Sequence, residues 1–524
     1  MTEEGDSRYD REWVHVNHFK WTLDMTEYGA HGNHFERTPD MTEKGVSRFK
    51  RIPRYDKERL NAFLASETNS HEPQAKVGGQ SLSPNMAWQF HFTNILLHMA
   101  VTGAYVGMLQ TVGIHKLVCL WAGSLFASHP VHVEAVGGVV GRAELLAGFT
   151  FCLAIGAYTF YIKGKLCKGN LNANTTCPCL NIKSTDSNTK DPLFKSIRNT
   201  VWFWVSIGST CLGLMCKEQA ITALGVAFVL HAALVVTITP VKKNLLKNLI
   251  SETWLLFLIM VVIIWCRLTL STAVPSFTSA DNPAAHATSV LTRSLTIGRY
   301  WTLHARLLLL PHLLSFDWSM DAIPLVTSPL DTEIIPIIII VFGSSYSILI
   351  TVKALLIQKS MGNKEKKLTF PEPVHIAFAL GLLVIPFLPA SNLVVWVGFV
   401  AAERILYLPS MGAALLVALG SQGLVSRLKE SIPSLTKTNF KCFSHRKLER
   451  RRRRKKIIEI VNVLWVLLVI LMGGRTVRRN WDWYTDETLY KSGIKICPAK
   501  GDIWMVEKKL RKYMISSLSV HRFS

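Results

Sequence analysis

Charged and polar side chains gather in short segments between long apolar runs of this chain. Their chemistry-bearing residues are His129, His132, Glu134, Arg142, Glu144, Lys217, Glu218, Arg293, Glu403 and Arg404. A cluster of Arg and Lys can hold a phosphate, and Arg is suited to bidentate contact with it. A carboxylate nearby can take a proton from an acceptor hydroxyl. A lipid-linked phosphosugar donor would need this combination of groups.

A purely structural interpretation of these residues is also open. A single Arg or Glu at the end of a membrane helix can snorkel, or pair simply to close a bundle. Ionisable groups at membrane depth are costly, however, and such positions favour functional hypotheses. The repetition of Glu–Arg and Lys–Glu neighbours on one face favours a functional role over a purely structural one for the set as a whole.

The elements that would position these groups are apolar runs of roughly 17 to 25 residues, the length that crosses a ~30 Å hydrocarbon layer. They predict an all-α polytopic membrane protein of about ten spans. The ranges are 89–110, 116–130, 144–163, 199–215, 220–239, 249–268, 332–354, 373–389, 408–425 and 457–473. A further apolar piece, 299–316, is short and contains Arg306 and Pro311, so it predicts a re-entrant or interfacial helix.

Alternate gaps between the spans share a side of the membrane. Four gaps on one side are basic, and they contain 163–168, 242–247, 364–367 and 446–456. Basic loops are typical of the cytosolic side, so the polar segments fall on the lumenal or extracellular side. The sequon at Asn174 lies in a cytosolic gap and is predicted to be unmodified.

The net charge of +23 can indicate nucleic-acid binding, but most Lys and Arg residues lie in the short gaps between spans. The run Arg450–Arg454 directly precedes the last span and is typical of a topology determinant touching anionic headgroups. The ten cysteines show no zinc spacing, and no metal motif is evident, so we expect a metal-independent protein.

Residues 1–88 differ from the rest, because they are polar and carry a short degenerate repeat with no hydrophobic period. Such a segment cannot bury a core and is predicted to be disordered. We therefore divide the chain into this N-terminal segment, a transmembrane domain at 89–474 and a lumenal tail at 475–524.

The polar motifs, taken in order, resemble the transmembrane and tetratricopeptide-repeat-containing (TMTC) family of protein O-mannosyltransferases. The matching pieces are Phe90–His98, His129–Val136 with Gly141–Glu144, Cys216–Gln219, Asp317–Met320, Pro389–Leu393 and Ala402–Gly412. Each piece alone is weak, but all of them occur in order over residues 88–500. The resemblance implies a glycosyltransferase C-like helical bundle in the endoplasmic-reticulum membrane.

The resemblance also implies a reaction, in which mannose passes from dolichyl phosphate mannose to Ser or Thr of secretory or membrane proteins such as cadherins. The partners would be this lipid-linked donor, the acceptor protein and membrane lipids, with no further cofactor. We expect four cations to bind the donor phosphate: Arg142, Lys217, Arg293 and Arg404. We expect six groups to orient them, contact the sugar or manage protons: His129, His132, Glu134, Glu144, Glu218 and Glu403.

Both ends of the sequence depart from the family pattern. Family members begin with one more span and a first lumenal loop bearing adjacent acidic residues, and they continue into tetratricopeptide repeats. Residues 1–88 show neither that span nor an Asp-Asp pair, and the tail is too short for the repeats. No catalytic Asp is therefore carried over, and a catalytically inactive adaptor or lipid binder on the same fold is the alternative function. A transporter is disfavoured because the two halves show no inverted repeat.

Overall fold

The structure is a computed structural model that describes residues 76–77, 80–81, 84–138, 141–169, 192–237, 243–270, 277–279, 281–319, 322–360, 373–393, 395–430 and 440–497. All the described residues belong to one compact unit within residues 74–524. The sequon at Asn174 lies outside the described residues. Most of residues 1–88, for which disorder was predicted, also lie outside them, and residues 84–88 belong to α2.

Helices dominate the described residues. After a two-residue hairpin of β1 (Lys76–Val77) and β2 (Gln80–Ser81), the first half of the bundle contains α2 (Pro84–Val112), α3 (Lys116–Ser128), η1 (Pro130–His132), α4 (Val133–Gly137), α5 (Arg142–Gly169), α6 (Pro192–Cys216), η3 (Glu218–Ile221), α7 (Thr222–Thr237) and α8 (Lys243–Leu270). The second half contains α9 (Val290–Leu309), α10 (Ile334–Ser360), α11 (Pro373–Val384), η5 (Ile385–Ala390), η6 (Glu403–Leu406), α12 (Pro409–Glu430), α13 (Phe440–Asp482) and α14 (Asp486–Ile496).

Eight helical segments of the described residues are long and apolar enough to cross a membrane. The prediction of an all-α polytopic membrane protein is thereby confirmed. Two of the ten predicted ranges are not among these eight segments. Helix α3 has 13 residues and therefore spans only ~20 Å, which is too short for the hydrocarbon layer. The range 199–215 lies inside α6, which has 25 residues and is long enough to cross the hydrocarbon layer but is not among the eight segments.

Burial separates inner helices from outer ones. Most residues of α7 are buried, whereas α8, α10 and α13 expose large apolar side chains such as Leu258, Phe342 and Leu471. Exposed apolar surface on this scale is unstable in water and stable in a bilayer. The main core lies between α2, α3, α5, α7, α11 and α12. At Gly412 a Cβ atom would lie 2.3 Å from the Leu383 backbone nitrogen, so α12 can approach α11 only without a side chain there.

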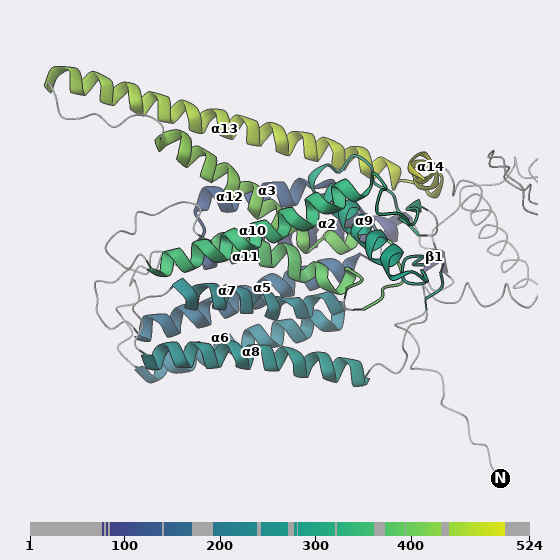
Figure 1. Ribbon diagram of the computed structural model, residues 1–524, viewed down its shortest axis with the longest axis horizontal. Helices are drawn as coiled ribbons and strands as arrows, with labels where there is room; N and C mark the ends of the chain where they lie inside the picture. The colour runs from purple at the N-terminus through teal and green to yellow at the C-terminus, as the bar shows by residue number, and fades with distance from the viewer. Residues whose placement is uncertain are drawn as a thin grey trace, which may run out of the picture. The chain divides into compact units, whose positions relative to one another are not determined.

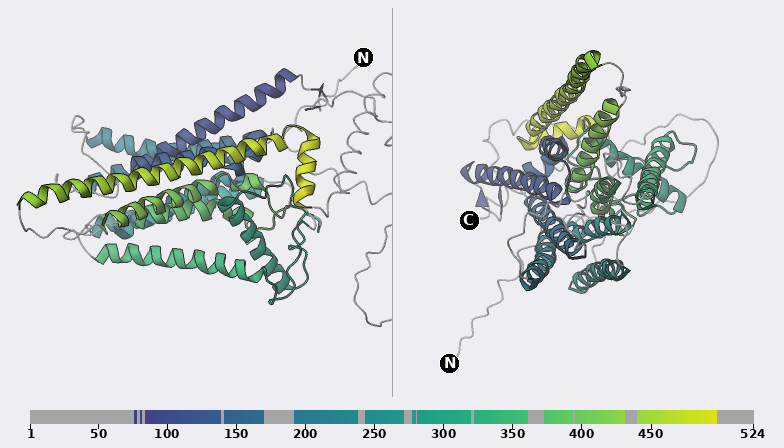
Figure 2. Two further views of the ribbon diagram at one scale, coloured as in Figure 1. Left: turned by 90° about the horizontal axis from the view of Figure 1, so that it is seen from above. Right: turned by 90° about the vertical axis from the view of Figure 1, so that its left-hand side faces the viewer.

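The helix ends separate into two groups (Figure 1). The C-terminal ends of α5, α7, α10 and α12, and the starts of α6, α8, α11 and α13, lie at one end, which we call the basic end because the four basic sequence gaps adjoin these helices. The opposite end carries η1, α4, η3 and η6 and is called the motif end. Figure 2 shows from a second side that α9 and α14 also lie there, both oblique to α10 and α13.

Two sequence-predicted boundaries are wrong. The piece expected at 299–316 is α9, which begins at Val290 and ends at Leu309, because Pro311 offers no backbone N–H to extend it. The last span, expected at 457–473, is part of α13, which continues unbroken to Asp482. The first two turns of the expected tail are therefore helical and carry Arg475, Arg478 and Arg479.

A second, smaller core lies at the motif end. It joins α9 to the loops around η1 and η6 through Val131, Tyr300, Leu314, Ile405 and Leu406. Because these side chains are buried together, they fix the backbone of η6 against that of η1. This packing positions Glu134, which follows η1, and Arg404, which lies within η6.

Candidate active site

Four charged residues from separate segments meet at the motif end. The Lys217 Nζ atom lies 2.5 Å from Glu144 Oε1, and the Arg404 Nε atom lies 3.9 Å from the same oxygen. Arg404 Nε also lies 3.7 Å from Glu134 Oε1, and the backbone N–H of Arg404 donates to Glu134 Oε2 at 2.9 Å. We call Glu134, Glu144, Lys217 and Arg404 the charge cluster.

The backbone around Gly141 explains how α4 and α5 bring the two carboxylates together. A Cβ atom at Gly141 would lie 1.9 Å from the Ala135 carbonyl oxygen, so only glycine permits the approach. The chain then enters α5, whose first turn carries Glu144. Lys217 precedes η3 in an extended conformation, which directs it toward the start of α5.

The cations are the more exposed members of the charge cluster. The side chains of Arg404 and Lys217 are 30% and 21% exposed, against 11% for Glu134 and 6% for Glu144. Burial raises the pKa of Glu134, and the charge of Arg404 partly offsets that rise. The cluster therefore presents two cations outward, held from behind by two carboxyl groups. Such an arrangement can bind an anionic group without reorganising.

Glu403 is adjacent to Arg404 in sequence but belongs to a different pair. It is fully buried, and its Oε1 atom lies 3.5 Å from Nη2 of the equally buried Arg479. Burial raises the pKa of Glu403 to about 8, against the opposing effect of Arg479. Arg479 also contacts Asp482, with an Nη1 to Oδ2 distance of 3.3 Å. Glu403 thus anchors η6 to α13 through Arg479, and the nearby charge of Glu134 also raises its pKa.

The two histidines of the first motif are engaged inside the protein. His129 accepts the backbone N–H of Val131 at Nδ1, and its Nε2 atom lies 3.0 Å from the Leu308 carbonyl oxygen. His132 Nε2 lies 2.8 Å from Ser410 Oγ. Burial lowers the pKa of His129 to about 4 and lowers the pKa of His132 well below its usual value. Both rings are neutral at physiological pH and tie η1 to α9 and α12.

The other three predicted residues make separate contacts. Arg142 donates to Asn94 Oδ1 at 3.1 Å and lies over the Phe90 ring, close to the start of α5. Arg293 donates to the Ala287 carbonyl oxygen at 2.8 Å and lies over Trp396. Glu218 accepts from Arg267 Nη2 at 2.8 Å near the surface. Among the described residues, no hydrogen bond or ion pair joins these three side chains to the charge cluster, although the charge of Lys217 also acts on the neighbouring Glu218.

Some residues at the motif end were not singled out from the sequence. Asn94 holds Arg142 and donates to the carbonyl oxygens of Val136 and Gly138, so it links α2 to α4. Arg479 was missed because the last span was expected to end at residue 473. An Arg that follows the expected end of a span gives no sequence signal that it is buried. Asn94 does give a signal, because it is a polar residue within an apolar run.

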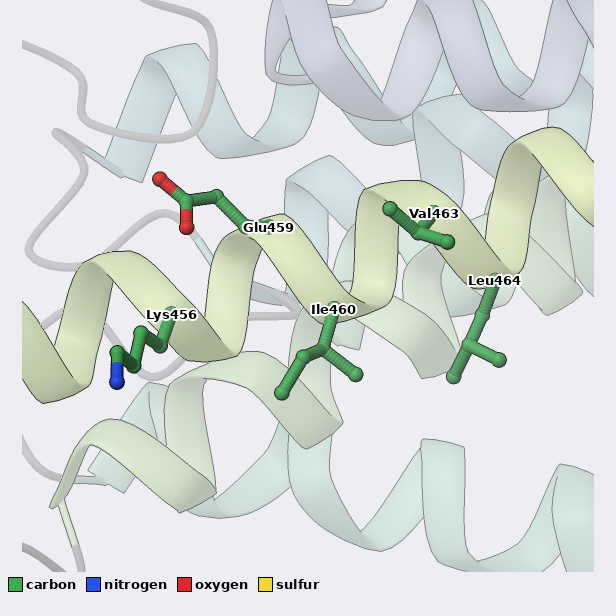
Figure 3. A pocket seen from close by; sticks show the side chains of 5 residues that line it. All are labelled: Lys456, Glu459, Ile460, Val463 and Leu464. Carbon is green, nitrogen blue, oxygen red and sulfur yellow. The ribbon is translucent and has the colours of Figure 1, made fainter.

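A cavity of about 320 Å³ on α13 does not compete with the charge cluster as a substrate site (Figure 3). It is lined by Lys456, Glu459, Ile460, Val463 and Leu464, all from one helix. Its lining lies near the basic half of α13 and is mostly aliphatic. A sugar phosphate needs several converging polar groups, so this cavity is not the candidate active site.

Comparisons with known proteins agree with the motif order. Residues 271–344, which include α9, match the family model described as Protein O-mannosyl-transferase TMTC, DUF1736. Protein O-mannosyl-transferase TMTC2 of Homo sapiens is 30% identical over 81% of this chain. TMTC4 of the same organism is 32% identical over 79% of the chain, and TMTC3 is 29% identical over 81%. The chain belongs to the TMTC family.

This TMTC chain covers 50% of the length of human TMTC2, 51% of TMTC4 and 40% of TMTC3. It therefore spans about half the length of the relatives it matches, each of which is named a protein O-mannosyl-transferase. No solved structure matches the chain significantly.

Proposed function

We propose that this TMTC chain transfers mannose from dolichyl phosphate mannose to Ser or Thr of secretory-pathway proteins, in the endoplasmic-reticulum membrane. The names of its relatives support O-mannosylation as the reaction class. The charge cluster is the observation that carries the proposal. It places two partly exposed cations at the motif end, where a phosphate headgroup anchored by a lipid tail could reach them.

In this reaction the charge cluster would stabilise the leaving phosphate. When the bond between the mannose C1 atom and the phosphate oxygen breaks, negative charge grows on that oxygen. Arg404 and Lys217 would contact this charge, and preorganised cations of this kind are commonly the largest single contribution to catalysis. Glu144 lies against both cations and would keep their head groups in place before the donor arrives.

The acceptor hydroxyl must lose a proton as it attacks C1. Glu134 is the carboxyl group of the charge cluster best suited to take that proton, because burial raises its pKa toward neutrality. It is also held by the backbone N–H of Arg404, so its position is coupled to that of the phosphate-binding arginine. Arg142 would extend the cationic surface from the start of α5. Arg293, Glu218 and the two histidines would act by supporting the surrounding loops.

The proposal is tested by mannose transfer in microsomes from cells that lack their own enzymes of this family. The donor is radiolabelled dolichyl phosphate mannose, and the acceptor is a cadherin domain. Transfer by the wild-type chain should be lost in Arg404→Ala and retained in Arg306→Ala. Arg306 is a matched control because its side chain is exposed on α9, away from the charge cluster. Absence of transfer by folded, inserted wild-type chain would contradict the proposal and favour the inactive adaptor.

A further inference from the structure

A second group of cations lines a cavity where α13 ends and α14 begins. The cavity has a volume of about 380 Å³. Its polar and charged lining comes from Arg475, Arg478, Asp482, Thr488, Lys491, Ser492 and Lys495, with Leu314, Trp481 and Ile496 as its apolar part. Four cations and one carboxylate therefore face the same space, separate from the charge cluster.

The positive charge of this cavity is only partly neutralised. Arg475 donates hydrogen bonds to the carbonyl oxygens of Pro311 and His312, which are neutral acceptors. Arg478 pairs with Asp482 at 3.1 Å, and Lys491 pairs with Glu487 at 2.5 Å. Even with both carboxylates counted, the four cations of the cavity leave two positive charges in excess. An anion is the ligand that this field favours.

The place of these cations at the motif end is itself informative. Lys and Arg near membrane spans are mostly explained by topology, which concentrates them at the cytosolic side. The junction of α13 and α14, whose residues line this cavity, lies at the opposite end from the four basic gaps, so topology gives no reason for its charge (Figure 1). The exposed rings of Trp481 and Tyr484 lie beside it, and such aromatic residues are typical of the membrane–water interface.

We propose that this cavity binds the phosphate headgroup of an anionic phospholipid from the leaflet at the motif end. Arg478, Lys491 and Lys495 would contact the phosphate, and Trp481 with Leu314 would border the first part of the acyl chains. Arg and Lys side chains that converge on one space can hold a phosphate by charge-assisted hydrogen bonds. A bound lipid would hold α14 against the end of α13.

The test measures binding of dioctanoyl-phosphatidylglycerol to the purified full chain in detergent. Dioctanoyl-phosphatidylcholine and inorganic phosphate are the comparison ligands. A triple variant, Arg478→Gln with Lys491→Gln and Lys495→Gln, removes three cavity cations. Its matched control removes three exposed cations elsewhere, at Lys116, Arg306 and Lys353. Each cation near a lipid surface contributes about fivefold to affinity, so the triple variant should bind the anionic lipid more than tenfold more weakly, while the control binds normally.

Three results would overturn the inference. They are equal binding of phosphatidylglycerol by the triple variant, equal affinity for phosphatidylcholine, and an affinity for inorganic phosphate as high as for the lipid. The last would indicate a free-phosphate site. If the triple variant does not elute as a single species in gel filtration, Lys495→Gln alone replaces it, with an expected loss of about fivefold. None of these measurements depends on mannose transfer, so they are independent of the proposed function.

Discussion

Arg479 and Glu403 face each other inside the protein, with Nη2 and Oε1 3.5 Å apart and neither side chain exposed. This pair joins the end of α13 to η6, the turn that also carries Arg404. The position of Arg404 in the charge cluster thus depends on the contact that the preceding residue, Glu403, makes with Arg479.

Removing the buried arginine should destabilise the protein strongly. Arg479→Gln removes the contacts with Glu403 and Asp482, and leaving a buried polar group without its partner costs about 1–3 kcal/mol. Arg478→Gln is the control on the same turn, because it also contacts Asp482 but is exposed, and exposed pairs contribute about 0–1 kcal/mol. Thermal unfolding in detergent compares the two. Equal melting temperatures for the two variants would show that the pair does not support the fold.

The raised pKa of Glu403, about 8, predicts a pH dependence of stability. In the unfolded chain this carboxyl ionises near its usual pKa of 4.5, whereas in the folded protein it retains its proton until about pH 8. The folded state therefore binds more protons in this window, and stability falls as the pH rises from about 4.5 to 8. Glu403→Gln should lose that part of the decline. Melting curves of both proteins between pH 5 and 9 measure the difference, and parallel profiles would refute it.

His129 predicts a loss of stability in acid. Burial lowers its pKa to about 4, so the unfolded chain takes up a proton at a higher pH than the folded protein does. The stability associated with neutral His129 is present above pH 6.5 and is lost as the pH falls toward 4. His129→Asn can still accept the Val131 N–H but does not titrate. Its melting temperature should fall less than that of the wild type between pH 6.5 and 4.5, and an identical fall would count against this assignment.

Glu144 and Lys217 should act as one unit in mannose transfer. A charge-assisted hydrogen bond contributes about 1.5–3 kcal/mol, so Glu144→Gln or Lys217→Gln should each lower kcat/KM by about ten- to a hundredfold. The double variant should lose less than the sum of the two single losses, because both single variants remove the contact between Glu144 and Lys217. The half-buried pair Arg299 and Glu333, 3.0 Å apart and outside the charge cluster, serves as the control pair. Fully additive losses would show that Glu144 does not position Lys217.

The sequence was most informative where apolar length alone decides the structure. Runs near 89–110 and 332–354 became α2 and α10, because a run of this length has few alternatives to a membrane helix. Helix ends were less predictable. Neither the adjacent Gly473 and Gly474 nor the following arginines ended α13, because polar helix formers continue a helix once its core is packed.

The candidate site shows a different limit. The alternation of basic and polar gaps was enough to assign Glu134, Glu144, Lys217 and Arg404 to one end of the bundle. Which of them touch could not be read from the sequence, since contact depends on tertiary packing around Gly141 and η6. Glu403 illustrates this, because the short η6 turn directs it away from its neighbour Arg404 and toward Arg479.

The most direct test of the donor-site assignment is equilibrium binding of radiolabelled dolichyl phosphate mannose to the purified chain in lipid nanodiscs. Binding can be measured whether or not the chain completes the reaction. Arg404→Ala should weaken donor binding more than tenfold, since a charged hydrogen bond contributes about 1.5–3 kcal/mol, while Arg306→Ala should bind like the wild type. Equal affinity of Arg404→Ala and the wild type would contradict the assignment of the charge cluster to the donor phosphate.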